Sequence, residues 1–147
     1  MILVSACLLG ENCKYSGGNN RREAVCRFLE GRDYIAFCPE RAGGLPTPRL
    51  PSERRGAGVV ARDGTDVTEA FRLGAERALA LCREKGVTLA IFKEGSPSCG
   101  SRVIYDGSFS GRKIPGRGVT AELLEENGIS VLGEDELPAE GDGGIFC

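Results

Sequence analysis

Four apolar runs alternate along this chain with three stretches whose apolar residues recur at helical spacing. Apolar runs of this length, bounded by turn residues, are typical of strands that are buried on both faces of a sheet. The alternation of strand and helix predicts an α/β fold, a three-layer sandwich with a mostly parallel sheet in a flavodoxin-like or Rossmann-like strand order. The expected strands span residues 1–7, 34–38, 87–92 and 129–132.

The three helical stretches begin and end at residues that commonly terminate helices. A side chain that can accept a hydrogen bond from a free N–H of the first turn precedes each stretch. A glycine follows each stretch, as is typical of the C-terminal end. We expect N-caps at Asn19 or Asn20, at Asp66 and at Thr120, and helix ends at Gly31, Gly86 and Gly128.

Two further segments predict small β-hairpin insertions. Residues 52–65 place arginines around an apolar triplet and then a turn, which indicates a β-ribbon or a mobile flap. Residues 103–110 contain Asp106-Gly107 between apolar residues, which predicts a hairpin with a type I′ turn. No G-x-G-x-x-G pattern follows the first strand, so we expect no dinucleotide site.

The chain has the size of one domain. At 147 residues it can bury roughly two-thirds of the surface of its unfolded chain, which is enough for stability without disulfides. We expect a single α/β domain over residues 1–133, followed by an acidic, glycine-rich and poorly ordered tail over residues 134–147.

Charge and cysteine content disfavour several classes of protein. A net charge of −2 argues against a binder of nucleic-acid polymers or of membrane surfaces, and no apolar run is long enough to span a bilayer. The seven cysteines are an odd number, and without an export signal they do not indicate a disulfide framework. We therefore expect a soluble cytoplasmic protein with reduced thiols, either a monomer or a homodimer.

The chain contains no histidine. This removes the side chain that most often serves as a general base and as a nitrogen ligand of metals. Any acid–base chemistry has to be carried out by carboxylates, lysines, serines, tyrosines or thiols.

Three cysteines lie at or just beyond the ends of apolar runs. Cys7 ends the first run, Cys38 ends the second, and Cys99 lies in the Gly/Pro-containing loop after the third. Because the carboxyl ends of parallel strands meet at one edge of a sheet, where ligands bind, the three thiols are expected to lie close together. The sequence therefore predicts a three-thiolate site.

Several ligands suit such a site. Soft thiolates favour iron–sulfur clusters, zinc or Cu(I). Three thiolates without histidine fit a cubane cluster with one iron left open. A structural zinc usually takes a fourth cysteine or histidine, often in C-x-x-C pairs, and the chain has no C-x-x-C sequence for zinc or for dithiol catalysis.

The cysteines also have a simpler interpretation. Free cysteine is often a small buried apolar residue, and this is what we expect of Cys26 and Cys82, which fall on helical apolar stripes. The same interpretation stays open for the three strand-end cysteines. Cys13, in the loop after Cys7, either lines the site or has no role in it.

Three sequence motifs around these cysteines resemble a bacterial family whose characterised members are thiouracil desulfidases. The resemblance covers nearly the whole chain. It implies a [4Fe–4S] cluster with one open iron, which would act on a small thiolated nucleobase such as 2-thiouracil, or on a related thioamide, and release sulfide. The motifs are SACLLG around Cys7, CPE from Cys38 and SPSCG around Cys99, and the implied cluster ligands are these three cysteines.

The same resemblance implies that a glutamate and a serine lie near the substrate. These map to Glu40, as the base that activates water, and to Ser96, while Ser98 is a second serine that can position the ring or relay a proton. The alternatives are a salt bridge from Glu40 to Arg41 or Arg49, and ordinary turn chemistry for the two serines.

Other charged residues leave further possibilities open. Glu94 is the next candidate base after Glu40, and Lys93 is either a steering charge for an anionic substrate or a surface charge. The arginine-rich segment 49–62 is either a solvated face or a flap over the site. The alternative functions are a cluster-binding sensor without desulfidase activity, for which no basic DNA-binding helix is visible, and a scaffold without a cofactor.

Overall fold

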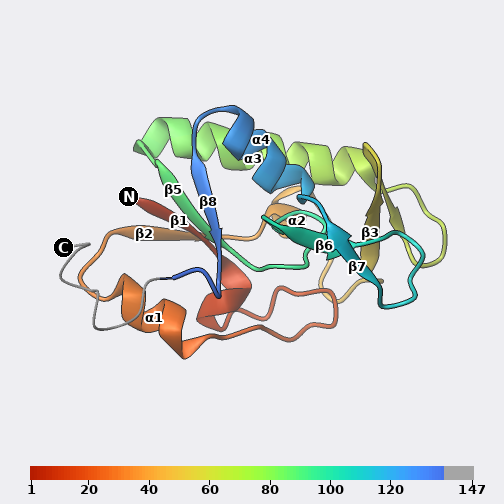
Figure 1. Cartoon of the computed structure of the whole chain (residues 1–147), viewed down its shortest axis with the longest axis horizontal. Coiled ribbons are helices and arrows are strands. Elements are labelled where there is room, and N and C mark those ends of the chain that lie inside the picture. The colour runs from red at the N-terminus through yellow and green to blue at the C-terminus, as the bar shows by residue number, and fades with distance from the viewer. Residues whose placement is uncertain (138–147) are drawn as a thin grey trace.

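The computed structural model of the chain describes residues 1–137. At its centre is a four-stranded sheet in the order β2-β1-β5-β8, in which every neighbouring pair is parallel (Figure 1). This order is flavodoxin-like, with the chain moving outward on one side of β1 and then on the other. The expected α/β sandwich is confirmed. The strands are β1 Ile2–Ser5, β2 Tyr34–Phe37, β5 Leu89–Phe92 and β8 Ser130–Gly133.

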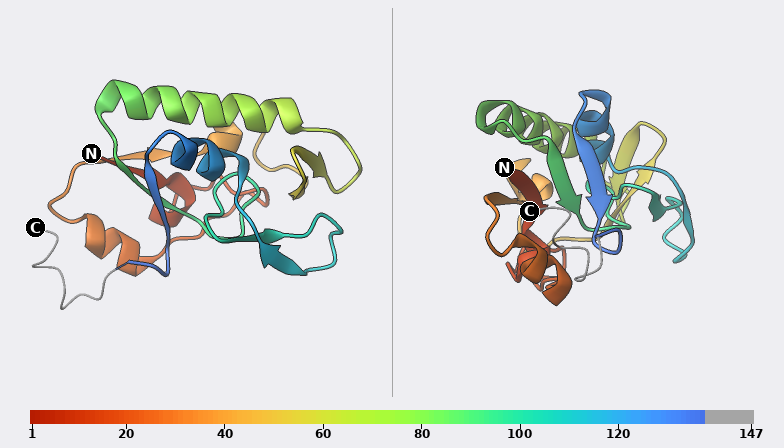
Figure 2. Two further views of the ribbon diagram at one scale, coloured as in Figure 1. Left: turned by 45° about the horizontal axis from the view of Figure 1, so that its top comes forward. Right: turned by 60° about the vertical axis from the view of Figure 1, so that its left-hand side comes forward.

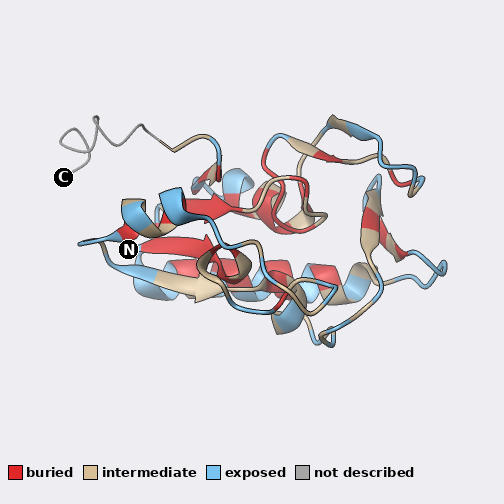
Figure 3. Ribbon diagram, turned by 90° about the horizontal axis from the view of Figure 1, so that it is seen from below, coloured by how far each residue is buried: buried red, intermediate tan, exposed pale blue. Residues whose placement is uncertain are grey.

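Helices cover both faces of this sheet (Figures 1 and 2). Helix α1, Glu23–Leu29, packs on one face, and α3, Thr68–Lys85, together with α4, Val119–Glu126, packs on the other. Successive side chains of a strand point to opposite faces. Accordingly, Leu3 of β1 joins the core cluster of α3 and α4, whereas Val4 joins that of α1. The buried central strands stand out in Figure 3.

The first expected hairpin is present and the second differs. Strands β3, Ser52–Arg55, and β4, Gly58–Ala61, pair antiparallel, which confirms the ribbon. In the second hairpin, β6, Val103–Tyr105, pairs with β7, Lys113–Pro115. The two strands are joined by residues 106–112, so the prediction of a tight type I′ turn at residues 106–107 is wrong. The N–H group of Gly107 donates to Glu53 of β3 instead of closing a tight turn.

Two of the expected N-caps are also wrong. Helix α1 begins after Arg22, and the Asn20 side chain donates to the sulfur of Cys7 instead of capping a helix. Helix α4 begins after Gly118, which leaves Thr120 inside the helix, fully buried. In both cases tertiary contacts override the local preference of the side chain for a helix end.

The long helix α3 begins and ends close to where its sequence predicts. Val67 is the N-cap, one residue later than expected, and the Asp66 carboxylate still accepts a hydrogen bond from the N–H of Thr68, at 2.9 Å. Glu69 pairs with Arg72 and does not complete a capping box. Gly86 ends the helix in the left-handed conformation, with φ of 69°.

The segment after β8 turns back onto the domain. Glu134 is only 4% exposed, and its carboxylate accepts a hydrogen bond from the N–H of Glu94 and pairs with Lys93. Leu137 packs against the α1 side of the core. The rest of the expected tail, residues 138–147, lies outside the described residues. No helix in the described part of the chain combines the length and hydrophobicity needed to cross a membrane.

A close contact between two helices fixes the short helix α2, Pro39–Ala42, on α3. A Cβ atom added at Gly74 would collide with the carbonyl of Pro39, and one at Gly43 with the carbonyl of Ala70. Glycine is required at both positions because the two backbones approach too closely for a side chain. This contact sets the position of the residues on and beside α2.

We expect Gly74→Ala to lower the free energy of unfolding by about 1–3 kcal/mol, because the added methyl group overpacks the contact between α2 and α3. Urea denaturation of the two proteins measures the difference. Glu76→Ala, on the exposed side of the same helix, is the control and should change stability little. Equal midpoints for Gly74→Ala and Glu76→Ala would contradict a tight contact.

Candidate active site

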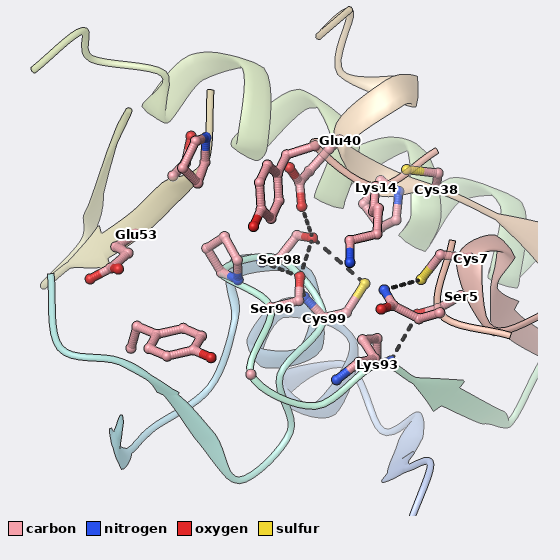
Figure 4. Close-up of a pocket in the computed structure, with 18 of the residues that line it drawn as sticks. Ser5, Cys7, Lys14, Cys38, Glu40, Glu53, Lys93, Ser96, Ser98 and Cys99 are labelled. Atoms are coloured by element: carbon pink, nitrogen blue, oxygen red, sulfur yellow. Dashed lines mark hydrogen bonds between the residues drawn. The ribbon is translucent and has the colours of Figure 1, made fainter. Parts of the chain in front are cut away.

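A cavity of about 390 Å³ opens at the carboxyl edge of the sheet. Its floor is formed by the segments that follow β1, β2 and β5, and its outer wall by the two hairpins (Figure 4). Open α/β sheets bind their ligands at this edge, where the chain leaves the strands. The cavity is therefore the candidate active site.

The structure brings the three strand-end cysteines to this cavity. Cys7 lies in the 3₁₀ helix Ala6–Leu9 that directly follows β1, so the first strand is shorter than expected. Cys38 lies between β2 and α2, and Cys99 lies in the loop after β5. All three line the cavity, with Cys99 buried and the other two partly exposed (Figure 4).

Cys13 is a fourth thiol at the same place. It is 1% exposed, it lines the cavity, and its thiol hydrogen-bonds with those of Cys7 and Cys38. The sequence left its role open, because a loop position does not show where the loop returns. Among residues 1–137, no three His, Cys, Asp or Glu side chains are arranged to hold a single metal ion.

Hydrogen bonds and burial act on these thiols in opposite directions. The hydrogen bond with Cys13 is the main cause that lowers the pKa of Cys38 from 9.0 to about 6, and it also lowers the pKa of Cys7. The same contacts raise the pKa of Cys13. Burial raises the pKa of the Cys99 thiol. Cys7 and Cys38 therefore lose their protons more readily than an ordinary thiol, and Cys13 and Cys99 less readily.

A carboxylate and two hydroxyl groups lie beside the thiols. Glu40 Oε2 accepts a hydrogen bond from Ser98 Oγ at 3.2 Å, and Ser98 Oγ lies 3.1 Å from Ser96 Oγ (Figure 4). Ser98 Oγ also lies 3.6 Å from Cys99 Sγ. Ser98 Oγ thus lies in contact with the carboxylate, the second hydroxyl group and the buried thiol at once.

The alternative roles considered for Glu40 and the two serines, a salt bridge and turn chemistry, are present in part. Glu40 does form a salt bridge, with Arg49 at 3.1 Å, but through Oε1, so Oε2 still faces the serines. Arg41 pairs with Glu11 instead. Ser96 Oγ accepts hydrogen bonds from the N–H groups of residues 98 and 99, so this serine also shapes the turn.

Glu94 fastens the loop that carries Ser96, Ser98 and Cys99. One carboxylate oxygen accepts hydrogen bonds from the N–H groups of residues 101, 102 and 103, at 2.8, 2.8 and 3.0 Å, and the other accepts from Ser101 Oγ at 2.8 Å. Burial alone would raise the pKa of Glu94, but these bonds together lower it. With its lone pairs used in this way, Glu94 is a poor second candidate for the base.

Lys93 is part of the cavity wall and of an ion pair that the sequence analysis missed. Its ammonium group pairs with Glu134 at 3.0 Å and donates to the carbonyl oxygen of Glu94 at 2.8 Å. Its backbone N–H donates to Ser5 Oγ at 3.0 Å. No local pattern indicates a partner 41 positions away, so only the fold reveals it.

The outer wall of the cavity consists of the two hairpins. Glu53 of β3 is buried, and its carboxylate accepts hydrogen bonds from the N–H groups of Gly107 and Phe109, at 2.9 and 3.1 Å. Phe109 lines the cavity with a left-handed backbone, φ 58°, which is unusual for a side chain of its size. Within the arginine-rich segment, Arg62 lines the cavity, whereas Arg54 pairs with Glu122 on α4, so the segment is not a uniformly solvated face.

Together, the fold and the cavity define a small α/β protein with a thiol-lined active site. The family model described as 2-thiouracil desulfurase matches residues 2–136, and the chain belongs to this family. The resemblance drawn from the three motifs is confirmed.

Two relatives support this assignment over almost the full length. The uncharacterised protein YbbK of Bacillus subtilis (strain 168) is 44% identical over an alignment that covers 93% of this chain and 97% of that protein. The solved structure of TudS, a [4Fe-4S]-dependent thiouracil desulfidase, matches with a TM-score of 0.88 at 48% identity and covers 99% of this chain and 98% of that one.

We expect Glu94→Gln to destabilise the protein by about 1–2 kcal/mol at neutral pH, because hydrogen bonds to a charged acceptor are stronger than those to a neutral one. The lowered pKa of Glu94 means that its carboxylate stabilises the fold above its ordinary value of 4.5 and loses this effect as the pH falls through the lowered value. The difference in Tm between the two proteins should therefore shrink in acid. A difference that stayed constant with pH, as expected for exposed Glu69→Gln, would contradict this role.

Proposed function

We propose that this protein is a desulfidase that converts 2-thiouracil, or a related thiolated base or thioamide, into the oxo compound. The reaction consumes one water and releases one hydrogen sulfide for each C=S group that becomes C=O, so it is a hydrolysis without net oxidation or reduction. The observation that carries this proposal is the convergence of three strand-end thiols and the Glu40–Ser98 pair in one cavity.

The thiol set fits a [4Fe–4S] cluster. Cys7, Cys38 and Cys99 are the proposed ligands, and they provide the soft sulfur donors that such clusters require. The lowered pKa values of Cys7 and Cys38 favour the thiolate form needed for ligation. When bound through three thiolates, the cluster supplies an open iron that is a Lewis acid with affinity for sulfur.

The side chains around the thiols supply the acid–base chemistry. Arg49 occupies Oε1 of Glu40, so Oε2 is the oxygen that is positioned to take a proton from the attacking water. Ser98, which lies between this oxygen and Ser96, can hold the ring or pass the proton on. The hairpin wall limits the access of bulk water to the cavity.

The proposal includes the setting in which the enzyme works. Residues 1–133 form the cluster-binding domain, the partner is a small molecule, and the reducing cytoplasm keeps the free thiols available. Anaerobic reconstitution followed by assay of sulfide released from 2-thiouracil tests the function directly. A cluster-loaded protein that releases no sulfide would indicate the sensing alternative, and a colourless protein would indicate a scaffold.

We expect Cys7→Ser, Cys38→Ser and Cys99→Ser each to weaken iron binding by at least about tenfold, because even changes to groups that only support metal ligands cost this much. Iron content per chain after anaerobic reconstitution is the measurement. The control is Cys26→Ser, on α1 and away from the cavity, which should keep its iron. Equal losses in all four variants would show that the thiols have been assigned wrongly.

We expect Glu40→Gln to keep its iron and to bind 2-thiouracil, but to lose about two to four orders of magnitude in the rate of sulfide release, the usual contribution of a positioned general base. Glutamine has nearly the same shape but cannot take up a proton. The matched control is Glu11→Gln, whose carboxylate is paired with Arg41 outside the cavity. Full activity in Glu40→Gln would assign the base to another group.

A further inference from the structure

Arg49 lines the cavity and makes four side-chain hydrogen bonds there. Its side chain is only 7% exposed. Each of the three nitrogen atoms of the guanidinium group donates a hydrogen bond: Nε to Glu40 Oε1 at 3.1 Å, Nη1 to Pro46 O and Thr47 Oγ1 at 3.1 and 3.2 Å, and Nη2 to Cys13 O at 2.9 Å. One side chain therefore joins α2, the turn at 46–47 and the loop that carries Cys13.

The bond to Glu40 determines which carboxylate oxygen faces the cavity. The terminal torsion of a glutamate is soft, so a lone carboxylate can turn freely. Arg49 holds Oε1, and the hydrogen bond from Ser98 then falls on Oε2. A base has to lie within hydrogen-bond reach of the proton that it removes, and small displacements are costly.

The bonds to the other side of the cavity fix the guanidinium group itself. Cys13 O accepts from Nη2, and the backbone N–H of Arg49 donates to Tyr15 O at 2.7 Å. The loop after Cys7 and the segment around residue 49 are therefore bonded to each other twice. A planar guanidinium group can make these contacts in several directions at once, which the single ammonium group of lysine cannot.

We propose that Arg49 is a positioning residue, which orients the carboxylate of Glu40 toward Ser98 and holds α2 and the loop that carries Cys13 in their relative positions. The proposal rests on the proposed function, because it takes Glu40 to be the base. Arg49 acts through Glu40 and not on the reacting atoms.

Arg54 offers a matched control for a purely structural role. Its side chain is also largely buried, 14% exposed, and it forms an ion pair with Glu122 at 2.6 Å. It also donates to the carbonyl oxygens of Gly56 and Arg117, at 2.8 and 2.6 Å. It does not line the cavity. Removal of either arginine breaks a buried ion pair, but only removal of Arg49 releases Glu40.

The test compares cluster-loaded Arg49→Ala, Arg49→Lys and Arg54→Ala with the unchanged protein. We expect Arg49→Ala to keep its iron and a KM for 2-thiouracil within a few-fold, while kcat for sulfide release falls by about 100-fold, as for a misplaced catalytic group. Guanidinium ion at about 50 mM, far below denaturing concentrations, should restore kcat at least tenfold in Arg49→Ala and not in Arg54→Ala. Arg49→Lys, which keeps the charge, should lose kcat but less severely.

Crystal structures provide a readout that does not depend on turnover. In Arg49→Ala the Glu40 carboxylate should leave Ser98 Oγ, and soaked guanidinium should return it. A carboxylate that stays in place, an unchanged kcat, a loss of iron, or failure of guanidinium to rescue would each overturn the positioning role. If Arg49→Ala does not fold, the test rests on Arg49→Lys. A kcat of Arg49→Lys equal to that of the unchanged protein would then overturn the proposal. Failure of the unchanged protein to release sulfide would refute the proposed function, while the position of Glu40 in these crystals would still decide the role of Arg49.

Discussion

Parallel pairing of β1 with both β2 and β5 is the constraint on which the rest of the molecule depends. It places the ends of three strands next to one another, so that residues far apart in the sequence leave the sheet at one edge. The pairing leaves little freedom, because a shift of one residue would turn Leu3 and Val4 toward the wrong helices. The thiol-lined cavity is therefore a product of strand register as much as of the cysteines themselves.

The second constraint is the set of hydrogen bonds that holds the loops beyond that edge of the sheet. Glu94 gathers three backbone N–H groups and a hydroxyl of the loop that carries Cys99. The first turn of α4 holds the other side of the same loop, because the carbonyl oxygen of Ser98 accepts hydrogen bonds from the N–H groups of Thr120 and Ala121, at 2.9 and 3.1 Å. A segment rich in glycine and serine is thus held from both sides, which lowers the entropy that it would otherwise lose when it binds a ligand.

The sequence predicted the sheet and the convergence of Cys7, Cys38 and Cys99 because both follow from local rules, namely apolar runs and what lies at their ends. The predictions from the sequence failed where contacts with residues far away in the chain determine the local structure. Thr120 has the chemistry of an N-cap, but the close approach of Gly118 to the Ser98 backbone starts the helix one residue before it. The path by which the chain returns to the cavity determines the ion pair of Lys93 with Glu134 and the position of Cys13. No residue near them in the sequence indicates this path.

The cavity is built from two kinds of parts that can change independently. The cysteines and Glu40 lie on short connections from the central sheet, whereas Tyr105, Phe109 and Arg62 belong to hairpins that are inserted between sheet elements. The hairpins are joined to each other through Glu53. Longer hairpins, or hairpins with other side chains, would alter the shape of the cavity without disturbing the edge of the sheet that carries the thiols. The architecture thus places the thiols and the walls that shape the cavity on separate elements of the chain.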